Sequence, residues 1–535
     1  MEFAPLAEKI VDAVLEADPV AASYAGDHRF DHRLPDLSTD GVAADVMMLR
    51  EAAHALSQVD GDALAPADQV DLEILTGIVD RQLFERTDVR EHEWNPLVHN
   101  PGALLHALMA RPFAPLEERL EALAMRMEAV PDALATARTL LDDCPQVHLE
   151  TGVGQFQGAA ELVRDQLPPL LAQVPGLAGV VGPAADRAIA ELEGFAAWLG
   201  KQRPVRDPRL GRKLFEARLW HTLDTELSAA QILDRAEANL ERVTEEIREV
   251  ALQLAGGSGR ADDQVVRAAL RSLSEQRPAN DTIVELARRT MTETTGFVRD
   301  NDLVSLVDDP CVLEEMPEFA RGVAVAYCDA PGPLETADVP TFYCISPTPR
   351  DWSPELVESF YREYNDHMVR NLTVHEAMPG HFLQLAHARR YRGTTNVRAV
   401  GASGPFIEGW AVYAEEVMAD HGFGGLPVRM QQLKMQLRMT INAILDQLVH
   451  CDGLVEEDAM ALMIERGFQE RGEAAGKWRR ALLTSTQLST YFVGWAEVSA
   501  IGRARPTGTP VREWHDAMLG QGSPSPRHLR TLLGV

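Results

Sequence analysis

Residues 375–381 read His-Glu-Ala-Met-Pro-Gly-His, and these residue types could hold a metal ion and activate water. Zinc in a catalytic site takes three protein ligands of the histidine or carboxylate type and keeps one position open for water. The bound water loses a proton near neutral pH, and a neighbouring carboxylate can accept it. His375 and His381 are therefore candidate metal ligands, and Glu376 is the candidate general base.

The spacing of the two histidines differs from that of an ordinary zinc-binding helix. The usual HExxH motif places the histidines four residues apart on one helical face. Here the separation is six residues, which on a regular helix leaves the two side chains about 120° apart. Pro379 disfavours helical geometry at the residue before it, and Gly380 allows unusual dihedral angles. We therefore predict that the helix breaks at residues 377–380 and brings His381 back beside His375.

A third ligand is predicted from the segment GPFIEGWAVYAEE at residues 404–416. Pro405 suits the first turn of a helix, which places Glu408 in the first turn of an otherwise apolar helix. A carboxylate on an apolar face needs a partner, and a metal ion is a suitable one. The alternative is a carboxylate that stabilises the positive end of the helix dipole. Glu415 and Glu416 are expected to support the ligands from behind or to face solvent.

Two further segments offer polar groups that could serve such a site. A predicted helix at residues 427–451 carries a polar side chain every four residues, including Arg438, Asp446 and His450. A ligating histidine usually donates its other N–H to a carboxylate, and Asp446 is the candidate for that role; the alternative is a solvated helix face. Tyr491 could donate its hydroxyl to a developing oxyanion, with His450 or Arg438 in support, or could be a packed core aromatic.

Four blocks of this sequence together resemble a bacterial family known as domain of unknown function 885, whose members look like gluzincin-type metallopeptidases. The blocks are HEAMPGHFLQ at 375–384, EGWAVYAE at 408–415, the polar helix at 438–450 and QLSTYFVG at 487–494. The resemblance covers the last third of the chain well and the N-terminal half loosely.

This resemblance implies a mainly α fold with a zincin-like helical metallopeptidase architecture around a deep cleft. It implies one zinc ion per chain, with His375, His381 and Glu408 as ligands and Glu376 as general base. It also implies Tyr491 as an oxyanion donor, with Asp446 and Gln487 supporting the site. Where the family often has Pro-Gly before this glutamine, the chain has Ser485-Thr486.

The elements that must position these residues are mostly amphipathic helices. Apolar residues recur at three- and four-residue spacing in the segments 114–142, 184–200, 228–254, 262–273 and 279–297. Residues 321–347 break this rhythm, because the β-prone runs Val323–Cys328 and Thr341–Ile345 flank a Pro/Gly-rich stretch. We predict a strand pair or small sheet beside the metal site, where an edge strand could hold a substrate backbone.

Chain length and the position of the motifs predict three regions. Residues 1–215 form an N-terminal helical region, residues 216–320 form a helical middle region that walls the cleft, and residues 321–535 form the metal-binding region with the small sheet. The apolar fraction of 45% in 535 residues is enough to bury a large core.

The charge and cysteine content limit the classes of partner. Lys and Arg total 51 against 81 Asp and Glu, and the resulting net charge of −30 argues against binding to nucleic acid or to anionic membranes. Neither a signal peptide nor a membrane-spanning run is recognisable. Five scattered cysteines without CxxC spacing fit a reducing compartment, so a cytoplasmic location is expected. The oligomeric state is not predicted.

These patterns predict a zinc-dependent hydrolase that cleaves amide bonds, acting on short peptides as a metallo-oligopeptidase or an exopeptidase. A metal-dependent enzyme for a dedicated small-molecule or natural-product substrate is the first alternative. An inactive helical scaffold or binding protein is the second. Histidine and carboxylate ligands also suit manganese, cobalt and iron.

Overall fold

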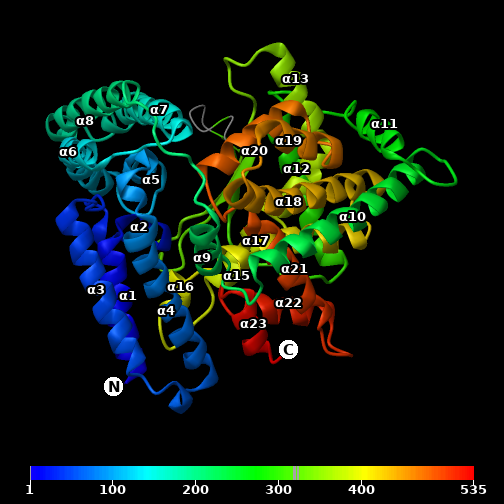
Figure 1. The fold of residues 1–535 in the computed structure, drawn as a ribbon, viewed down its shortest axis with the longest axis horizontal. Coiled ribbons are helices and arrows are strands. Elements are labelled where there is room, and N and C mark those ends of the chain that lie inside the picture. The colour runs from blue at the N-terminus through cyan, green and yellow to red at the C-terminus, as the bar shows by residue number, and fades with distance from the viewer. Residues whose placement is uncertain (1, 317–320, 322–323) are drawn as a thin grey trace. The chain divides into compact units, whose positions relative to one another are not determined.

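The computed structural model of this chain describes residues 2–316, 321 and 324–535 (Figure 1). The chain forms two compact units. The first comprises Met1–Pro208, Pro331–Val339 and Gly393–Gly401, and the second comprises Arg209–Ala330, Pro340–Arg392 and Ala402–Val535. The end of the predicted region 1–215 lies close to the first of these boundaries. The predicted regions 216–320 and 321–535 fall mostly in one unit, because helices from both pack into the same core.

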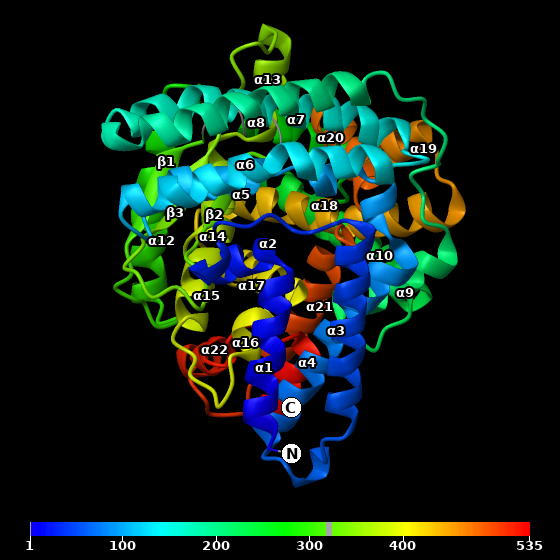
Figure 2. The same cartoon turned by 90° about the vertical axis from the view of Figure 1, so that its left-hand side faces the viewer.

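The described residues of the first unit form α-helices, short 3₁₀ and π-helical turns and connecting loops, without a strand. Its α-helices are α1 (Phe3–Ala17), α2 (Pro19–Ala25), α3 (Thr39–Ser57), α4 (Pro66–Phe84), α5 (Gly102–Ala110), α6 (Leu116–Leu140), α7 (Gln146–Leu171), α8 (Ala178–Leu199) and α16 (Val397–Val400). Helices α6, α7 and α8 lie side by side (Figure 2) around an apolar core that includes Phe156 and Phe195. Helices within 114–142 and 184–200 are thus confirmed, but the break expected at Pro131 is absent, because Pro131 lies inside the continuous helix α6.

Both later segments of the first unit are held there by polar contacts to the N-terminal helices. Arg398 and Asp71 form an ion pair at 2.6 Å, each with a side chain only 1% exposed, and the Thr395 hydroxyl donates to the same carboxylate at 2.7 Å. The His28 ring bonds to Glu335 at 2.8 Å. A buried ion pair adds little net stability, because both charges lose their water. Its main effect here is to fix the position of the segment that carries Arg398.

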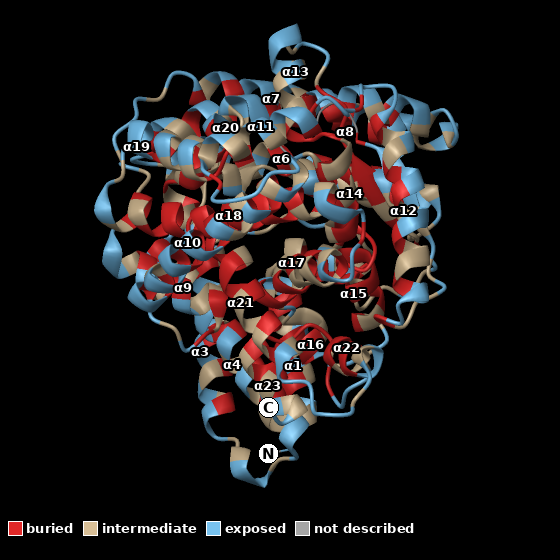
Figure 3. Cartoon of the chain, turned by 90° about the vertical axis from the view of Figure 1, so that its right-hand side faces the viewer, coloured by how far each residue is buried: buried red, intermediate tan, exposed pale blue. Residues whose placement is uncertain are grey.

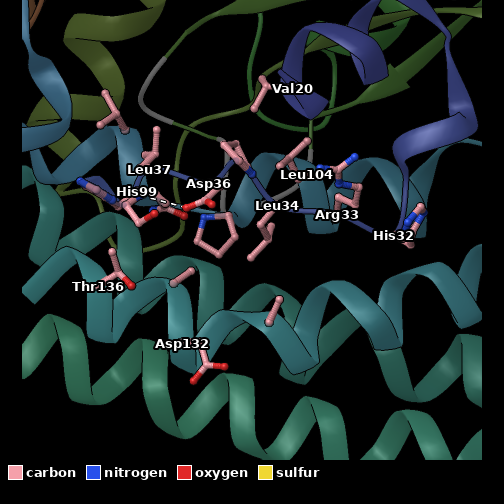
Figure 4. Close-up of a pocket in the computed structure, with 17 residues that line it drawn as sticks. Val20, His32, Arg33, Leu34, Asp36, Leu37, His99, Leu104, Asp132 and Thr136 are labelled. Carbon is pink, nitrogen blue, oxygen red and sulfur yellow. Dashed lines mark hydrogen bonds between the residues drawn. The ribbon is translucent and has the colours of Figure 1, made fainter. Parts of the chain in front are cut away.

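A hollow in the first unit, with a volume of about 450 Å³, lies between residues 32–38 and helices α5 and α6 (Figure 4). Its lining mixes apolar side chains with His32, Arg33, Asp36 and Asp132. No residue predicted for the metal site lines it.

The second unit contains most of the remaining helices and the sheet. Its α-helices are α9 (Arg212–Leu223), α10 (Ala229–Leu254), α11 (Asp263–Leu273), α12 (Ile283–Asp300), α13 (Pro354–Glu363), α14 (Asp366–Glu376), α15 (His381–Ala388), α17 (Gly404–Asp420), α18 (Gly425–Asp452), α19 (Glu456–Ala461), α20 (Arg471–Leu483), α21 (Ser489–Arg503), α22 (Val511–Leu519) and α23 (Pro526–Leu533). Buried residues run along α17, α18 and α21 (Figure 3). Among the described residues, no helix has the length and apolar character needed to span a membrane.

A small sheet lies beside α14. Its strands are β1 (Cys311–Glu315), β2 (Ala326–Asp329) and β3 (Thr341–Ile345), in the order β1-β3-β2, with β1 parallel and β2 antiparallel to β3. The two predicted strands are confirmed, although Val323, in the first predicted run, lies outside the described residues. The third strand, β1, was not predicted. The Tyr343 hydroxyl hydrogen-bonds with the Thr373 hydroxyl of α14 at 3.1 Å, which ties the sheet to the helix that carries the first histidine.

Candidate metal centre

The helix break predicted at residues 377–380 is confirmed. Helix α14 ends at Glu376, the Met378–Pro379 peptide bond is cis, and α15 begins at His381. The Gly380 N–H donates to the Val374 carbonyl at 2.9 Å, so the chain folds closely over the end of α14. A Cβ atom at position 380 would overlap the carbonyl oxygens of His375 and Val374, which explains why a glycine stands there.

The turn between the helices brings the two histidines together. Their ring centroids lie 4.7 Å apart with an interplanar angle of 87°. The buried Trp410 indole donates to the Pro379 carbonyl at 2.9 Å, and this bond joins the turn to α17. This hydrogen bond therefore connects the turn that positions both histidines with α17, the helix that carries the predicted third ligand, Glu408.

Glu408 completes a group of three ligand atoms. Its Oε2 lies 3.5 Å from Nε2 of His375 and 3.5 Å from Nε2 of His381. One ligand atom from each of the three residues lies within 4.8 Å of the others. The start of α17 is fixed by Pro405 in its first turn and by the Ser403 hydroxyl, which accepts from the backbone N–H of Phe406 at 3.4 Å.

These three residues fit a zinc ion. Oε2 of Glu408 is buried and has no hydrogen-bond partner among the described residues, which is costly for a carboxylate unless a cation is present. In tetrahedral zinc sites, bonds of about 2.0–2.2 Å place neighbouring ligand atoms about 3.3–3.6 Å apart. The two separations of 3.5 Å fall in that interval. Burial alone would raise the pKa of Glu408, but the two imidazoles outweigh it and lower that pKa.

Glu415 holds the first histidine from behind. Its Oε1 lies 2.7 Å from Nδ1 of His375, and its Oε2 accepts from the Asn371 side chain at 2.5 Å. This contact leaves Nε2 of His375 facing Glu408. Burial lowers the pKa of His375, yet the carboxylates of Glu408 and Glu415 raise it above the ordinary value. Nδ1 of His381 has no such partner within the part of the chain that the structure describes.

Replacing Glu415 with glutamine is expected to weaken zinc binding by about 10- to 100-fold, as is typical when the carboxylate behind a ligating histidine is lost. Competition with a chromophoric chelator measures this affinity. Glu416→Gln is the matched control, because the Glu416 carboxylate accepts from the Trp495 indole at 2.6 Å and from Ser499 at 3.2 Å. Equal zinc affinities for wild type and Glu415→Gln would show that Glu415 does not contribute to metal binding.

Glu376 is the last residue of α14 and directly follows a ligand. Its side chain is buried, and the described residues make no hydrogen bond to its carboxylate. Burial raises the pKa of Glu376, while the two histidines lower it. On β2, burial raises the pKa of Cys328 and the charge of Glu376 adds to that effect. A carboxylate in this position is suited to accept a proton from water.

The role predicted for Asp446 needs correction. Its carboxylate accepts from the backbone N–H of Thr486 at 2.9 Å, and from the N–H and hydroxyl of Ser489 at 3.0 and 2.7 Å. Asp446 therefore holds the turn at the start of α21, where this chain has Ser485-Thr486, and makes no contact with the candidate ligands. Glu415 occupies the supporting position instead.

His450 is also engaged elsewhere, which corrects its predicted support of an oxyanion. Nε2 lies 3.0 Å from the Ala481 carbonyl and 2.9 Å from the Thr484 carbonyl, so it must carry a hydrogen. Nδ1 lies 3.3 Å from the N–H of Leu210 and must accept. The ring stacks on Phe215. A neutral, buried ring with both nitrogens bonded has no donor left for a substrate.

Arg438, Tyr491 and Gln487 make polar contacts away from the three candidate ligands. Arg438 forms an ion pair with Glu473, and its predicted support of an oxyanion beside Tyr491 stays a prediction. The Tyr491 hydroxyl accepts from Arg480 at 3.2 Å and from the Gln487 amide at 3.3 Å. Gln487 thus contacts Tyr491 rather than the ligands. Because both contacts use oxygen lone pairs, the hydroxyl hydrogen of Tyr491 remains able to donate.

Tyr491 lies near the start of α21, alongside the start of α17. A Cβ atom at Gly409 would overlap the backbone of Gly494, so the two helices touch directly after Glu408 and one turn after Tyr491. Thr490 likewise lies beside Gly404. Tyr491 therefore belongs to the same end of the α17–α21 pair as the third ligand.

Two solved structures with TM-scores of 0.79 share this fold. A candidate lipoprotein of unknown function from Shewanella oneidensis aligns over 100% of both chains with 27% identity and a TM-score of 0.79. A candidate lipoprotein from Colwellia psychrerythraea has 15% identity and a TM-score of 0.79 over 99% of this chain and 98% of its own. An M32 carboxypeptidase from Deinococcus radiodurans R1 gives a TM-score of 0.43 with 11% identity, over 98% and 96%.

No curated protein matches this sequence. The model of a family described as bacterial protein of unknown function matches residues 19–533, nearly the whole chain. The match therefore extends well beyond the last third of the chain, where the sequence motifs lie. The chain therefore belongs to the DUF885 family of bacterial proteins of unknown function.

Proposed function

We propose that this protein is a zinc-dependent hydrolase that cleaves amide bonds of short peptides. The observation that best supports this is the convergence of His375, His381 and Glu408, with Glu376 beside them. Two imidazoles and one carboxylate are a common donor set in catalytic zinc sites, which keep a fourth position for water. A purely structural zinc site usually closes that position with a fourth protein ligand.

The residues of the site have distinct tasks in this proposal. A bound zinc ion supplies a Lewis acid that lowers the pKa of water and polarises a carbonyl group. Glu376 accepts the proton of the attacking water and returns it to the leaving amine. Tyr491 donates its hydroxyl hydrogen to the carbonyl oxygen as negative charge develops there. Glu415 keeps the ring of His375 oriented through its bond to Nδ1.

The position of β2 favours a peptide over other amides. In the order β1-β3-β2 this strand is at one edge of the sheet, and Cys328 on it lies within the electrostatic reach of Glu376. Edge strands bind extended peptides by main-chain hydrogen bonds, which requires no particular side chain. A substrate so aligned would place a peptide bond near the base.

Metal analysis with activity assays tests this proposal. Untagged protein purified without chelators is expected to hold close to one zinc ion per chain, and to cleave members of a peptide library. Chelation should abolish cleavage, and added zinc should restore it. Protein that holds no stoichiometric metal would favour the scaffold alternative. Metal-dependent cleavage of small amides but not of peptides would favour the small-molecule alternative. A cytoplasmic location remains a prediction, which cell fractionation tests.

A further inference from the structure

Three basic side chains on α18 and α20 form a cluster that we call the Arg438–Lys477–Arg480 cluster. The positive charges of Arg438 and Arg480 both act on Lys477 and lower its pKa. Glu473 is the carboxylate whose charge opposes them. Glu363 also acts on Arg438, but its carboxylate is paired with Lys434 at 2.8 Å, so the excess positive charge lies on Lys477 and Arg480.

Glu473 is already engaged by other groups. Arg438 forms an ion pair with its Oε1, and the Tyr364 hydroxyl donates to its Oε2 at 3.0 Å. Arg438 also donates to the Tyr364 oxygen at 3.2 Å. The charge of Glu473 is therefore largely matched by Arg438, which leaves the other two basic side chains uncompensated.

Lys477 is buried, with 7% of its surface exposed. Within the described part of the chain, no side chain forms an ion pair with its ammonium group or accepts a hydrogen bond from it. Burial, as the largest cause, together with the two arginines lowers the pKa of Lys477 to about 7, against the opposing effect of Glu473. A charged group on a largely buried side chain is costly without an ion-pair partner, and a bound anion would remove that cost.

Arg480 also favours an anion at this position, because no acidic group is among the acceptors Gln487 and Tyr491. Its guanidinium donates to Oε1 of Gln487 at 2.7 Å and to the Tyr491 hydroxyl at 3.2 Å, and both acceptors are neutral. The planar guanidinium has five N–H donors and suits a carboxylate with two oxygens. Because Arg480 contacts Tyr491, an anion bound there would lie beside the proposed oxyanion donor.

We propose that Lys477 and Arg480 bind the free C-terminal carboxylate of a peptide substrate. This inference rests on the proposed function, since it assigns the substrate class to the same site. It predicts that the protein acts near the C-terminus of short peptides, because the carboxylate is held next to Tyr491 while the scissile carbonyl lies at the ligand cluster. An internal stretch of a long chain has no such charge and would bind less well.

Calorimetric titration of the full chain with two probes tests the subsite. The probes are acetyl-tetra-alanine with a free C-terminal carboxylate and the same peptide as a C-terminal amide. Wild type is expected to bind the acid about tenfold or more tightly than the amide, as for a lost charge-assisted hydrogen bond. Lys477→Gln and Arg480→Gln should each reduce this preference, and Arg480→Lys should retain part of it. Arg471→Gln removes an exposed charge from the same helix and should leave the preference unchanged.

The outcomes separate this inference from the proposed function. Equal binding of acid and amide by wild type would overturn the subsite, and this comparison needs no variant to fold. Zinc-dependent hydrolysis of both probes at equal efficiency would keep the proposed function and reject the subsite. Preferential binding of the acid without any hydrolysis would keep the subsite and reject the proposed function.

Discussion

Glu376→Gln is expected to slow peptide hydrolysis by about 10²- to 10⁴-fold while the zinc content stays near one ion per chain. The amide has the size of the carboxylate but cannot accept the proton of the attacking water. Glu376 is not among the three residues whose ligand atoms converge, so its charge is not needed to hold the metal. Initial rates and metal analysis on the same preparation measure both effects.

The control for this variant is an exposed carboxylate on a neighbouring helix. Glu293 on α12 forms an ion pair with Arg370, and its side chain is 49% exposed, so Glu293→Gln should leave the rate and zinc content unchanged. Full activity in Glu376→Gln would eliminate Glu376 as the base. Loss of zinc together with activity would show instead that Glu376 helps to hold the ion.

Gly380→Ala is expected to abolish both zinc binding and activity, and to lower the free energy of unfolding by about 2–3 kcal/mol. The added methyl group would overlap the carbonyl oxygens of His375 and Val374. Backbone atoms at the end of a packed helix cannot move aside as a flexible side chain can, so the turn must open. His381 starts the next helix and would move away from His375.

Gly296→Ala on α12 provides the matched glycine substitution, since a Cβ atom there meets nothing within 4 Å. It should retain zinc and raise the free energy of unfolding by about 0.5–1 kcal/mol, because alanine is the better helix former. Denaturant unfolding and metal analysis distinguish the two variants. Normal zinc binding by Gly380→Ala would mean that the close turn is not needed to set His381.

The ligand cluster was predictable because its signals are local. Pro379 and Gly380 stand in the motif itself and determine where α14 must end, and the fold follows that expectation. Glu408 was found because a carboxylate in an apolar helix needs a partner. Glu415 could have been assigned to the support of His375 by one further step, because it lies two helical turns after Glu408 and faces the same side.

The polar helix α18 was harder to interpret. Periodicity indicates that Arg438, Asp446 and His450 share one side of the helix, but it does not say which element packs against that side. The carbonyls that end α20 and the turn before α21 cover Asp446 and His450. The strand β1 was missed because CVLEE is short, ends in two acidic residues and is mostly exposed, so it lacks the apolar alternation of a buried strand.

The path of the chain limits how this protein can be divided or inherited. The chain leaves one unit for the other after residues 208, 330, 339, 392 and 401, so neither unit is a contiguous stretch. A fragment that begins at Arg209 would carry Arg398 and Glu335 without their partners Asp71 and His28. No single cut in the gene can therefore deliver the metal centre as a transferable module. Both units are therefore encoded by one interleaved stretch, in keeping with a family model that spans residues 19–533.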